Sequence, residues 1–211
     1  MSTIEKDLEY EKSQWPIANN LYLRQFGNIH PIIRYDYNDL SLGRQMQQSG
    51  TDCTIVINGE RKNISEKFRS KDWGDVCIEL YSVYENNVSG WALTDIGVDY
   101  YAFFHPDGYN EVYGKAEFIS PKVVRRLAEQ FKPIFDGDSE LKSKLVQYER
   151  TKCIPRKVHG MNVKFINSYT TDKNTKRTYI GICVCIPRYE VKNLAKFMDE
   201  EYKEYLTVLK P

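Results

Sequence analysis

The hydrophobic pattern divides the chain into helical segments near both ends and a strand-rich middle. Scattered apolar residues among charged ones predict one or two amphipathic helices over residues 3–26, interrupted near Pro16. Residues 28–42 lack a clear period and are expected to be irregular. From Gly50 onward the pattern changes to short β-branched runs. These runs predict an antiparallel meander of about four strands, at residues 52–57, 63–69, 76–83 and 98–104.

Turn and cap residues mark the limits of several elements. Asn58 and Gly59 form a dipeptide typical of a two-residue hairpin turn. Ser120 and Pro121 are typical of an N-cap and a first helical residue, and apolar residues follow them at helical spacing. Further along we expect a helix at 139–150, strands at 158–169 and 178–186 around a polar loop at 170–177, and a final helix at 191–209. The predicted fold class is therefore α/β (α+β), with a central mixed, largely antiparallel sheet flanked by helices.

Length and composition favour one folded domain over residues 1–211. A chain of this length can bury a substantial core, and its 41% hydrophobic content is too high for a disordered protein. No run approaches about 18 apolar residues, and no basic stretch followed by an apolar one opens the sequence, so we expect neither a transmembrane helix nor a secretory signal. The five cysteines lack zinc-type spacing and are predicted to be free thiols in a reducing cytoplasm.

Charged residues inside predicted strands are the most informative chemical feature. Asp52 opens one strand, Glu66 and Lys67 lie in the middle of its hairpin partner, and Glu79 lies between apolar residues on the next strand. Because burying a charge is costly unless it is paired or bound to metal, we expect these side chains to converge on one site. Carboxylates are hard oxygen ligands suited to Mg²⁺ or Mn²⁺. With a lysine beside it, such a site could hydrolyse phosphodiesters through a metal-activated water.

The segment Gly-Thr-Asp at residues 50–52, followed by a hairpin and by Glu66 and Lys67, resembles the PD-(D/E)XK nuclease superfamily. That superfamily has the restriction-endonuclease-like fold, in which the Asp opens the second core strand and an acidic residue two positions before a Lys lies on the third. The resemblance implies a nuclease that uses Mg²⁺ (or Mn²⁺) and acts on DNA. It implies that Asp52, Glu66 and Lys67 are catalytic, and that Asp52 with Glu66 or Glu79 binds the metal.

The resemblance covers about residues 8–105 and has one departure, because the residue two positions before Lys67 is Ser65. On a regular strand Ser65 and Lys67 share one face, while Glu66 points to the other. Three interpretations follow from this arrangement. A bulge near Ser65 could bring both charges inward, Glu79 on the neighbouring strand could supply the missing carboxylate, or the site could be degenerate and the protein only bind.

Charge is unevenly distributed although the net charge is only +1. The strand–loop–strand segment 151–188 contains eight basic residues against Asp172 alone, so it carries +7 and leaves −6 for the rest. A basic cluster is typical of contact with a polyanion, and lysines that protect a sheet edge give the same pattern. The sequence leaves the oligomeric state open, with a homodimer among the alternatives. The expected nucleic-acid-binding residues are Gln48, Arg69, Lys173, Lys176 and Arg177.

Overall fold

The structure of the protein is a computed structural model. The residues that it describes are 3–27, 29–36, 42–69, 71–94, 97–106, 113–147, 152–171, 175, 177–198 and 205–209. The chain forms two compact units, of which unit 1 comprises residues 1–8, 74–95 and 122–197, and unit 2 comprises residues 9–73, 96–121 and 198–211. The expectation of a single domain over residues 1–211 stays a prediction. No helix among the described residues is long and apolar enough to cross a membrane.

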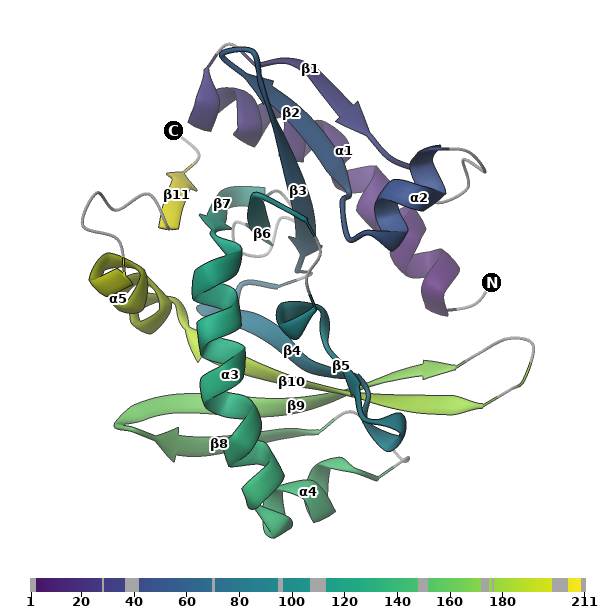
Figure 1. Ribbon diagram of the computed structural model, residues 1–211, viewed down its shortest axis with the longest axis vertical. Helices are drawn as coiled ribbons and strands as arrows, with labels where there is room; N and C mark the ends of the chain where they lie inside the picture. The colour runs from purple at the N-terminus through teal and green to yellow at the C-terminus, as the bar shows by residue number, and fades with distance from the viewer. Residues whose placement is uncertain are drawn as a thin grey trace. The chain divides into compact units, whose positions relative to one another are not determined.

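Unit 2 contains a six-stranded mixed sheet in the order β1-β2-β3-β6-β7-β11 (Figure 1). Neighbouring strands are antiparallel except β3 and β6, which run parallel. The strands are β1 (Ile29–Arg34), β2 (Cys53–Ile57), β3 (Glu60–Phe68), β6 (Tyr100–Pro106), β7 (Tyr113–Ile119) and β11 (Tyr205–Leu209). The helices α1 (Thr3–Phe26) and α2 (Leu42–Gln48) precede β1 and β2 in the chain.

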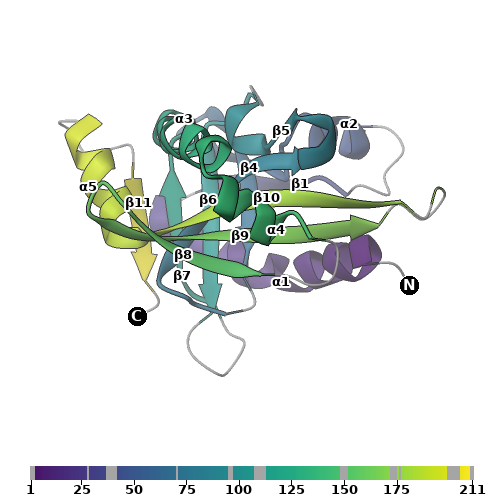
Figure 2. The same ribbon diagram turned by 90° about the horizontal axis from the view of Figure 1, so that it is seen from below.

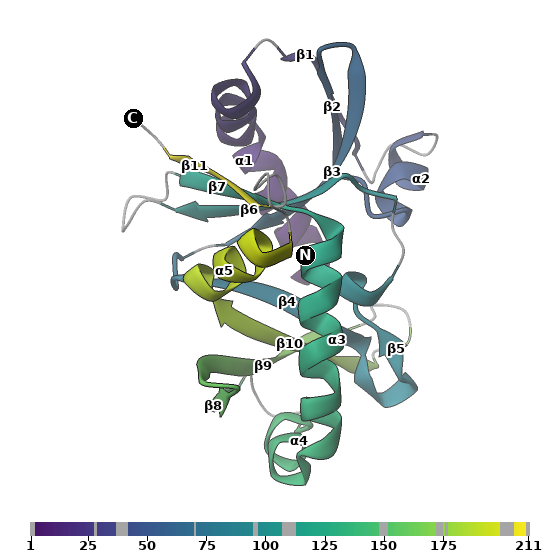
Figure 3. The same ribbon diagram turned by 60° about the vertical axis from the view of Figure 1, so that its left-hand side comes forward.

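Unit 1 contains a five-stranded antiparallel sheet in the order β5-β4-β10-β9-β8. Its long β9–β10 hairpin is clear in Figure 2, and α3 crosses the strands of this sheet in Figure 3. The strands are β4 (Asp75–Val83), β5 (Val88–Ser89), β8 (Cys153–Val158), β9 (Met161–Thr171) and β10 (Thr178–Pro187). The helices are α3 (Pro121–Gly137), α4 (Ser139–Leu145) and α5 (Arg188–Met198), with 3₁₀ turns η1 (Tyr84–Asn86) and η2 (Trp91–Leu93). The predicted α/β (α+β) class is confirmed.

Local signals in the sequence predicted several elements correctly. Asn58 and Gly59 have φ values of 51° and 85°, as a type I′ turn requires, and they join β2 to β3 as an antiparallel hairpin. Helix α3 begins at Pro121 as expected, and its predicted apolar face is buried. On that face Phe131 and Phe135 lie 6.5 and 6.1 Å from the ring of Phe165 on β9, measured between centroids.

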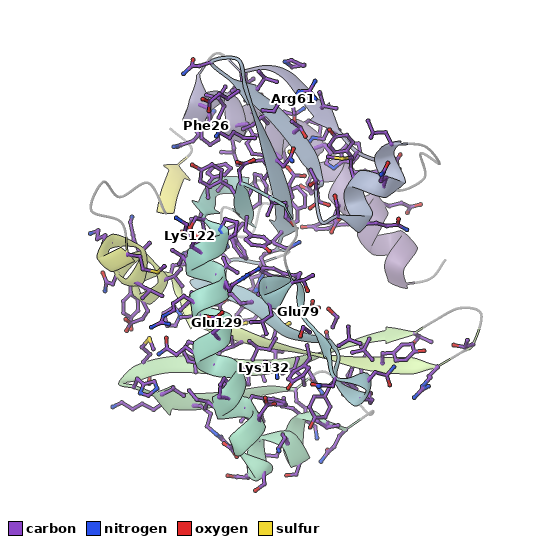
Figure 4. The ribbon with its side chains drawn as sticks, viewed as in Figure 1. Phe26, Arg61, Glu79, Lys122, Glu129 and Lys132 are labelled. Carbon is purple, nitrogen blue, oxygen red and sulfur yellow. The ribbon has the colours of Figure 1, made fainter. Side chains whose placement is uncertain are left out.

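The outer side of α3 carries the polar residues Lys122 and Glu129, both exposed (Figure 4). Lys132 lies with its Nζ 4.4 Å from the centroid of the Tyr81 ring and 3.0 Å from Oδ2 of Asp136. This division of polar and apolar residues is what the helical period predicts for a helix that covers a sheet.

Helix α1 runs without interruption through Pro16, so the predicted break there is wrong. A proline costs the helix one hydrogen bond. Packing compensates, because Ala18, Leu21 and Tyr22 on the following turns are buried in the core against the strands of unit 2.

The predicted meander is wrong, because strand order here depends on pairing between distant segments. Strand β4 follows β3 in the chain but belongs to the other sheet, between β5 and β10. The strand beside β3 is β6, with Ile64 opposite Tyr100 and Phe68 opposite Phe104. Alternation of polar and apolar residues identifies a strand but does not identify its partner.

Four further segments differ from the sequence-based expectation. Residues 28–42 were expected to be irregular but contain β1, an edge strand. Pro31 is tolerated there because it lies where the register with β2 shifts, between Ile29 and Ile32. The segments 113–119 and 153–158 form β7 and β8, which were not predicted. The expected helix at 191–209 ends at Met198, and residues 205–209 form β11 by pairing with β7.

A tight contact in unit 1 gives a stability prediction. Gly90 is buried, and a Cβ there would lie 2.2 Å from the backbone oxygen of Glu79. We expect Gly90→Ala to lower the free energy of unfolding by about 1–3 kcal/mol, because backbone must move to accommodate the methyl group. Urea denaturation measures this change. Gly137→Ala is the matched control, since its Cβ would contact nothing within 4 Å, and equal effects of the two substitutions would contradict the packing described.

Candidate functional site

Asp52 lies directly before β2, where the sequence placed it. Its N–H donates to the carbonyl oxygen of Ile64 at 2.9 Å, and its own carbonyl accepts from the N–H of Tyr35 at 3.1 Å. Backbone hydrogen bonds to both neighbouring segments therefore fix the position of Asp52 beside β3 in the sheet of unit 2.

Three side chains from the β2–β3 hairpin meet on one face of this sheet, and we call Asp52, Ser65 and Lys67 the Asp52 cluster. Ser65 donates from Oγ to Oδ2 of Asp52 at 3.3 Å, and Lys67 donates from Nζ to Ser65 Oγ at 2.9 Å. The N–H of Glu66 also donates to Oδ2 of Asp52, at 2.6 Å. The serine hydroxyl thus joins an acidic and a basic side chain from adjacent segments.

Strand β3 has no bulge at this point. Residues Ile64–Phe68 pair one to one with Tyr100–Phe104 of β6 without a register shift. The interpretation in which a bulge brings Glu66 and Lys67 to the same face is therefore wrong. Ser65 and Lys67 share one face, and Glu66 points to the other, as a regular strand requires.

Glu66 is held on the α1 side of the sheet by donors from three elements. Tyr22 of α1 donates from Oη to Oε1 at 2.6 Å, the guanidinium of Arg34 on β1 donates to Oε2, and the Cys53 thiol of β2 lies 3.8 Å from Oε1. Arg34 is oriented in turn by Oδ1 of Asn19, which accepts from Nε at 3.1 Å and from Nη2 at 2.7 Å.

The electrostatics of this group match a buried ion pair. Burial raises the pKa of Glu66, Arg34 lowers it, and the Asp52 carboxylate raises it further. Burial also raises the pKa of Tyr22 and of the Cys53 thiol well above their ordinary values, so both keep their protons and can donate. Both oxygens of Glu66 are therefore engaged in stabilising the fold.

Asp52 has a different environment. Burial raises the pKa of its carboxyl, while the Lys67 ammonium and the hydrogen bonds from Glu66 and Ser65 lower it. Both of those hydrogen bonds reach Oδ2, and within the described part of the chain no donor reaches Oδ1. Oδ1 is thus the atom of the Asp52 cluster that can accept a further ligand.

The donor set fits a hard divalent cation bound by one carboxylate. Among the described residues no group of three or more His, Cys, Asp or Glu side chains could hold a metal ion. Mg²⁺ does not need such a group, because it keeps several waters and is often bound by one or two carboxylates together with substrate phosphates. Oδ1 of Asp52 and the hydroxyl oxygen of Ser65 are oxygen donors of the kind it prefers.

Glu79 lies on β4 of unit 1, not on a strand beside β3 (Figure 4). The expectation that Glu79 is on a neighbouring strand of the same sheet is therefore wrong. Its Oε2 accepts from Ser82 Oγ at 2.6 Å and from the N–H of Trp91 at 3.1 Å. These contacts give it a local structural role at the start of η2.

The predicted nucleic-acid-binding residues are only partly described. Gln48 is exposed at the end of α2, and Arg69 is half-buried just after β3, where its N–H donates to the Phe104 carbonyl at 3.2 Å. Arg177 is exposed, with its guanidinium 5.3 Å from the ring centroid of Tyr179. Lys173 and Lys176 lie outside the described residues.

The basic segment 151–188 is partly neutralised by acidic residues of the same unit. Arg156 lies 3.1 Å from Oδ2 of Asp138 and 3.4 Å from Oε2 of Glu140, and Lys164 lies 3.6 Å from Oδ2 of Asp75. The net charge of the segment alone therefore overstates the positive charge that it can offer to a polyanion.

Sequence reasoning missed the residues that hold Glu66, namely Tyr22, Arg34 and Asn19. A signal for Arg34 was present in the sequence, because this charged residue directly follows the apolar pair Ile32 and Ile33. The same kind of pattern drew attention to Glu66 and Lys67. Nothing local marks Tyr22 or Asn19, since their contacts depend on how α1 packs on the sheet.

Comparison with protein-family models, with curated proteins and with solved structures found no match to this chain.

The buried ion pair gives a pH-dependent stability prediction. Arg34→Met should lower the free energy of unfolding by about 3 kcal/mol or more at neutral pH, because it leaves the Glu66 carboxylate buried without its cation. The pKa of Glu66 is higher in the folded protein than in the unfolded chain. Between these two values the folded protein binds more protons, so stability falls as pH rises through that interval. Without Arg34, which lowers the pKa of Glu66, the folded-state value rises further and the interval becomes wider. The destabilisation measured by urea denaturation should therefore be larger at about pH 8 than at about pH 5.

The control for this prediction is Lys12→Met, which breaks the half-exposed pair of Lys12 with Asp36 at 2.5 Å in the same unit. An exposed pair contributes about 1 kcal/mol or less, so this variant should stay close to the wild type at both pH values. Equal destabilisation by the two variants would contradict the structural role of Glu66.

Proposed function

We propose that the protein is a Mg²⁺-dependent nuclease that hydrolyses DNA phosphodiester bonds. The observation that carries the proposal is the Asp52 cluster, in which Asp52 and Lys67 approach the same serine hydroxyl on one sheet face. A carboxylate with a free oxygen and an ammonium group beside it are the two charges that such a reaction needs.

Each residue of the Asp52 cluster has a separate role in the proposed reaction. A bound Mg²⁺ would polarise the phosphoryl oxygen and lower the pKa of a water. Asp52 would hold this cation through Oδ1, and Lys67 would orient the attacking water and stabilise the negative charge that develops on the phosphate. Ser65 keeps the Lys67 ammonium close to Asp52, because its hydroxyl accepts from one and donates to the other.

The PD-(D/E)XK resemblance supports the same proposal. The expected positions are an Asp that opens the second strand and a Lys on the third, and Asp52 and Lys67 occupy these positions in the sheet of unit 2. The chain departs from the expected pattern at Ser65, where an acidic residue would stand. In our proposal one carboxylate therefore binds the metal, and waters and the DNA phosphate provide the remaining oxygens.

A non-catalytic nucleic-acid-binding or protein-interaction module is the alternative. The observation that favours it is the engagement of both Glu66 oxygens, which leaves a single carboxylate in the Asp52 cluster. Titration with Mg²⁺ or Mn²⁺ in a calorimeter separates the two proposals. Binding that is lost in Asp52→Asn supports the nuclease, and the absence of binding that depends on Asp52 supports the module.

The nuclease proposal predicts that Asp52→Asn and Lys67→Met each reduce Mg²⁺-dependent cleavage of plasmid DNA by about 100-fold or more, because each removes one of the two essential charges. The readout is the rate of conversion of supercoiled to nicked or linear DNA. Both variants should keep the circular dichroism spectrum of the wild type, since neither residue belongs to the hydrophobic core cluster of unit 2.

Glu60→Gln is the matched control on the same hairpin, because Glu60 is an exposed carboxylate at the turn end of β3. This variant should cleave at the wild-type rate. Cleavage at the wild-type rate by Asp52→Asn or by Lys67→Met would overturn the proposed function.

A further inference from the structure

Trp73 is an exposed aromatic residue that follows the strand of Lys67 in the chain. Its side chain is 56% exposed, although tryptophan is usually well buried in folded proteins. The ammonium of Lys71 lies 4.4 Å from the centroid of its ring. A cation beside an exposed aromatic ring is the combination with which proteins bind the phosphates and bases of single strands.

The contacts of the segment after β3 show where Trp73 is anchored. The N–H of Arg69 donates to the Phe104 carbonyl at 3.2 Å, which extends the pairing of β3 with β6. The next residue of β6, His105, is buried, and its Nδ1 lies 3.9 Å from Oδ1 of Asp72. Asp72, between Lys71 and Trp73, therefore lies beside the end of β6.

This anchor lies on the sheet face of the Asp52 cluster. Lys67 pairs in register with Phe103 on β6, so their side chains point to the same face. His105 is two residues beyond Phe103 and shares that face, because side chains alternate along a strand. Asp72 consequently reaches the face on which Lys67 lies.

The separation suits a short stretch of nucleic acid. Trp73 follows Lys67 by six positions, so their Cα atoms are at most about 22 Å apart even if the segment is fully extended. A single-strand site commonly covers about four nucleotides or more. One strand can therefore reach from the Asp52 cluster to the Trp73 ring.

We propose that Trp73 and Lys71 form a stacking site for an unpaired base, so that the DNA substrate is single-stranded or contains unpaired nucleotides beside the cleaved bond. This inference rests on the proposed nuclease function and adds the substrate class. The ring of Trp73 stacks on the base, and Lys71 contacts the adjacent phosphate. Bases inside a duplex are already stacked on one another and do not reach the ring.

A protein partner is the other occupant that an exposed tryptophan could have. The ammonium of Lys71, 4.4 Å from the centroid of the Trp73 ring, suits a phosphate better than an apolar partner. The pair therefore favours a nucleic acid.

The test compares binding of two DNA probes without metal, so that cleavage cannot interfere. Fluorescence anisotropy measures the affinity of the full chain, in EDTA, for oligothymidylate of about 12 nucleotides and for a duplex of the same length. Trp73→Ala should weaken oligothymidylate binding about tenfold or more and leave duplex binding unchanged. Trp73→Phe should bind close to the wild type, because it retains an aromatic ring.

Tyr189→Ala is the matched control, since Tyr189 is an aromatic residue with 59% exposure on α5 of unit 1. It should bind both probes as the wild type does. Wild-type binding of oligothymidylate by Trp73→Ala would overturn the proposal. An equal loss of affinity for both probes would also overturn it. A third contrary result would be self-association of the wild type, measured by light scattering, that Trp73→Ala abolishes while oligothymidylate binding persists.

This outcome can be separated from that of the nuclease proposal. The binding assay contains no metal and measures affinity, whereas the nuclease proposal is tested by Mg²⁺-dependent cleavage, so the two readouts are independent. If Asp52→Asn cleaved DNA normally, the nuclease proposal would fail, while a specific loss of single-strand binding in Trp73→Ala would still support the stacking site.

Discussion

The arrangement of the candidate site depends on the buried ion pair between Glu66 and Arg34. A buried carboxylate is tolerated only when donors satisfy it, and here a tyrosine, a guanidinium and a thiol from three elements do so. This interaction fixes which face of β3 lies against α1. Since side chains alternate along a regular strand, it also fixes Ser65 and Lys67 on the opposite face.

Strand β3 thereby separates Glu66, whose charge stabilises the fold, from Asp52 and Lys67, to which we assign the chemistry. The two environments are linked through the backbone, because the N–H of Glu66 donates to Asp52 while its carboxylate binds Arg34. Asp52 is oriented through Oδ2 and keeps Oδ1 for a ligand. In our account Glu66, the acidic residue next to Lys67, thus stabilises the fold, and Asp52 binds the metal.

The sequence predicted those features that depend on neighbouring residues. The hairpin at Asn58 and Gly59 and the position of Asp52 at the opening of a strand follow from local patterns. The parallel pairing of β3 with β6 and the transfer of β4 to another sheet do not, because both depend on contacts between distant segments. For the same reason the sequence marked Glu66 as a charged strand residue without showing that Tyr22 of α1 would engage its carboxylate.

The most direct test of this division of roles is the location of a bound metal ion. Crystals of the protein soaked in Mn²⁺ would reveal the ion by its anomalous scattering. Our account predicts an anomalous peak bonded to Asp52, with the Glu66 carboxylate still engaged by Arg34 and Tyr22. A peak bonded to Glu66, or a Glu66 side chain turned toward Lys67, would contradict it.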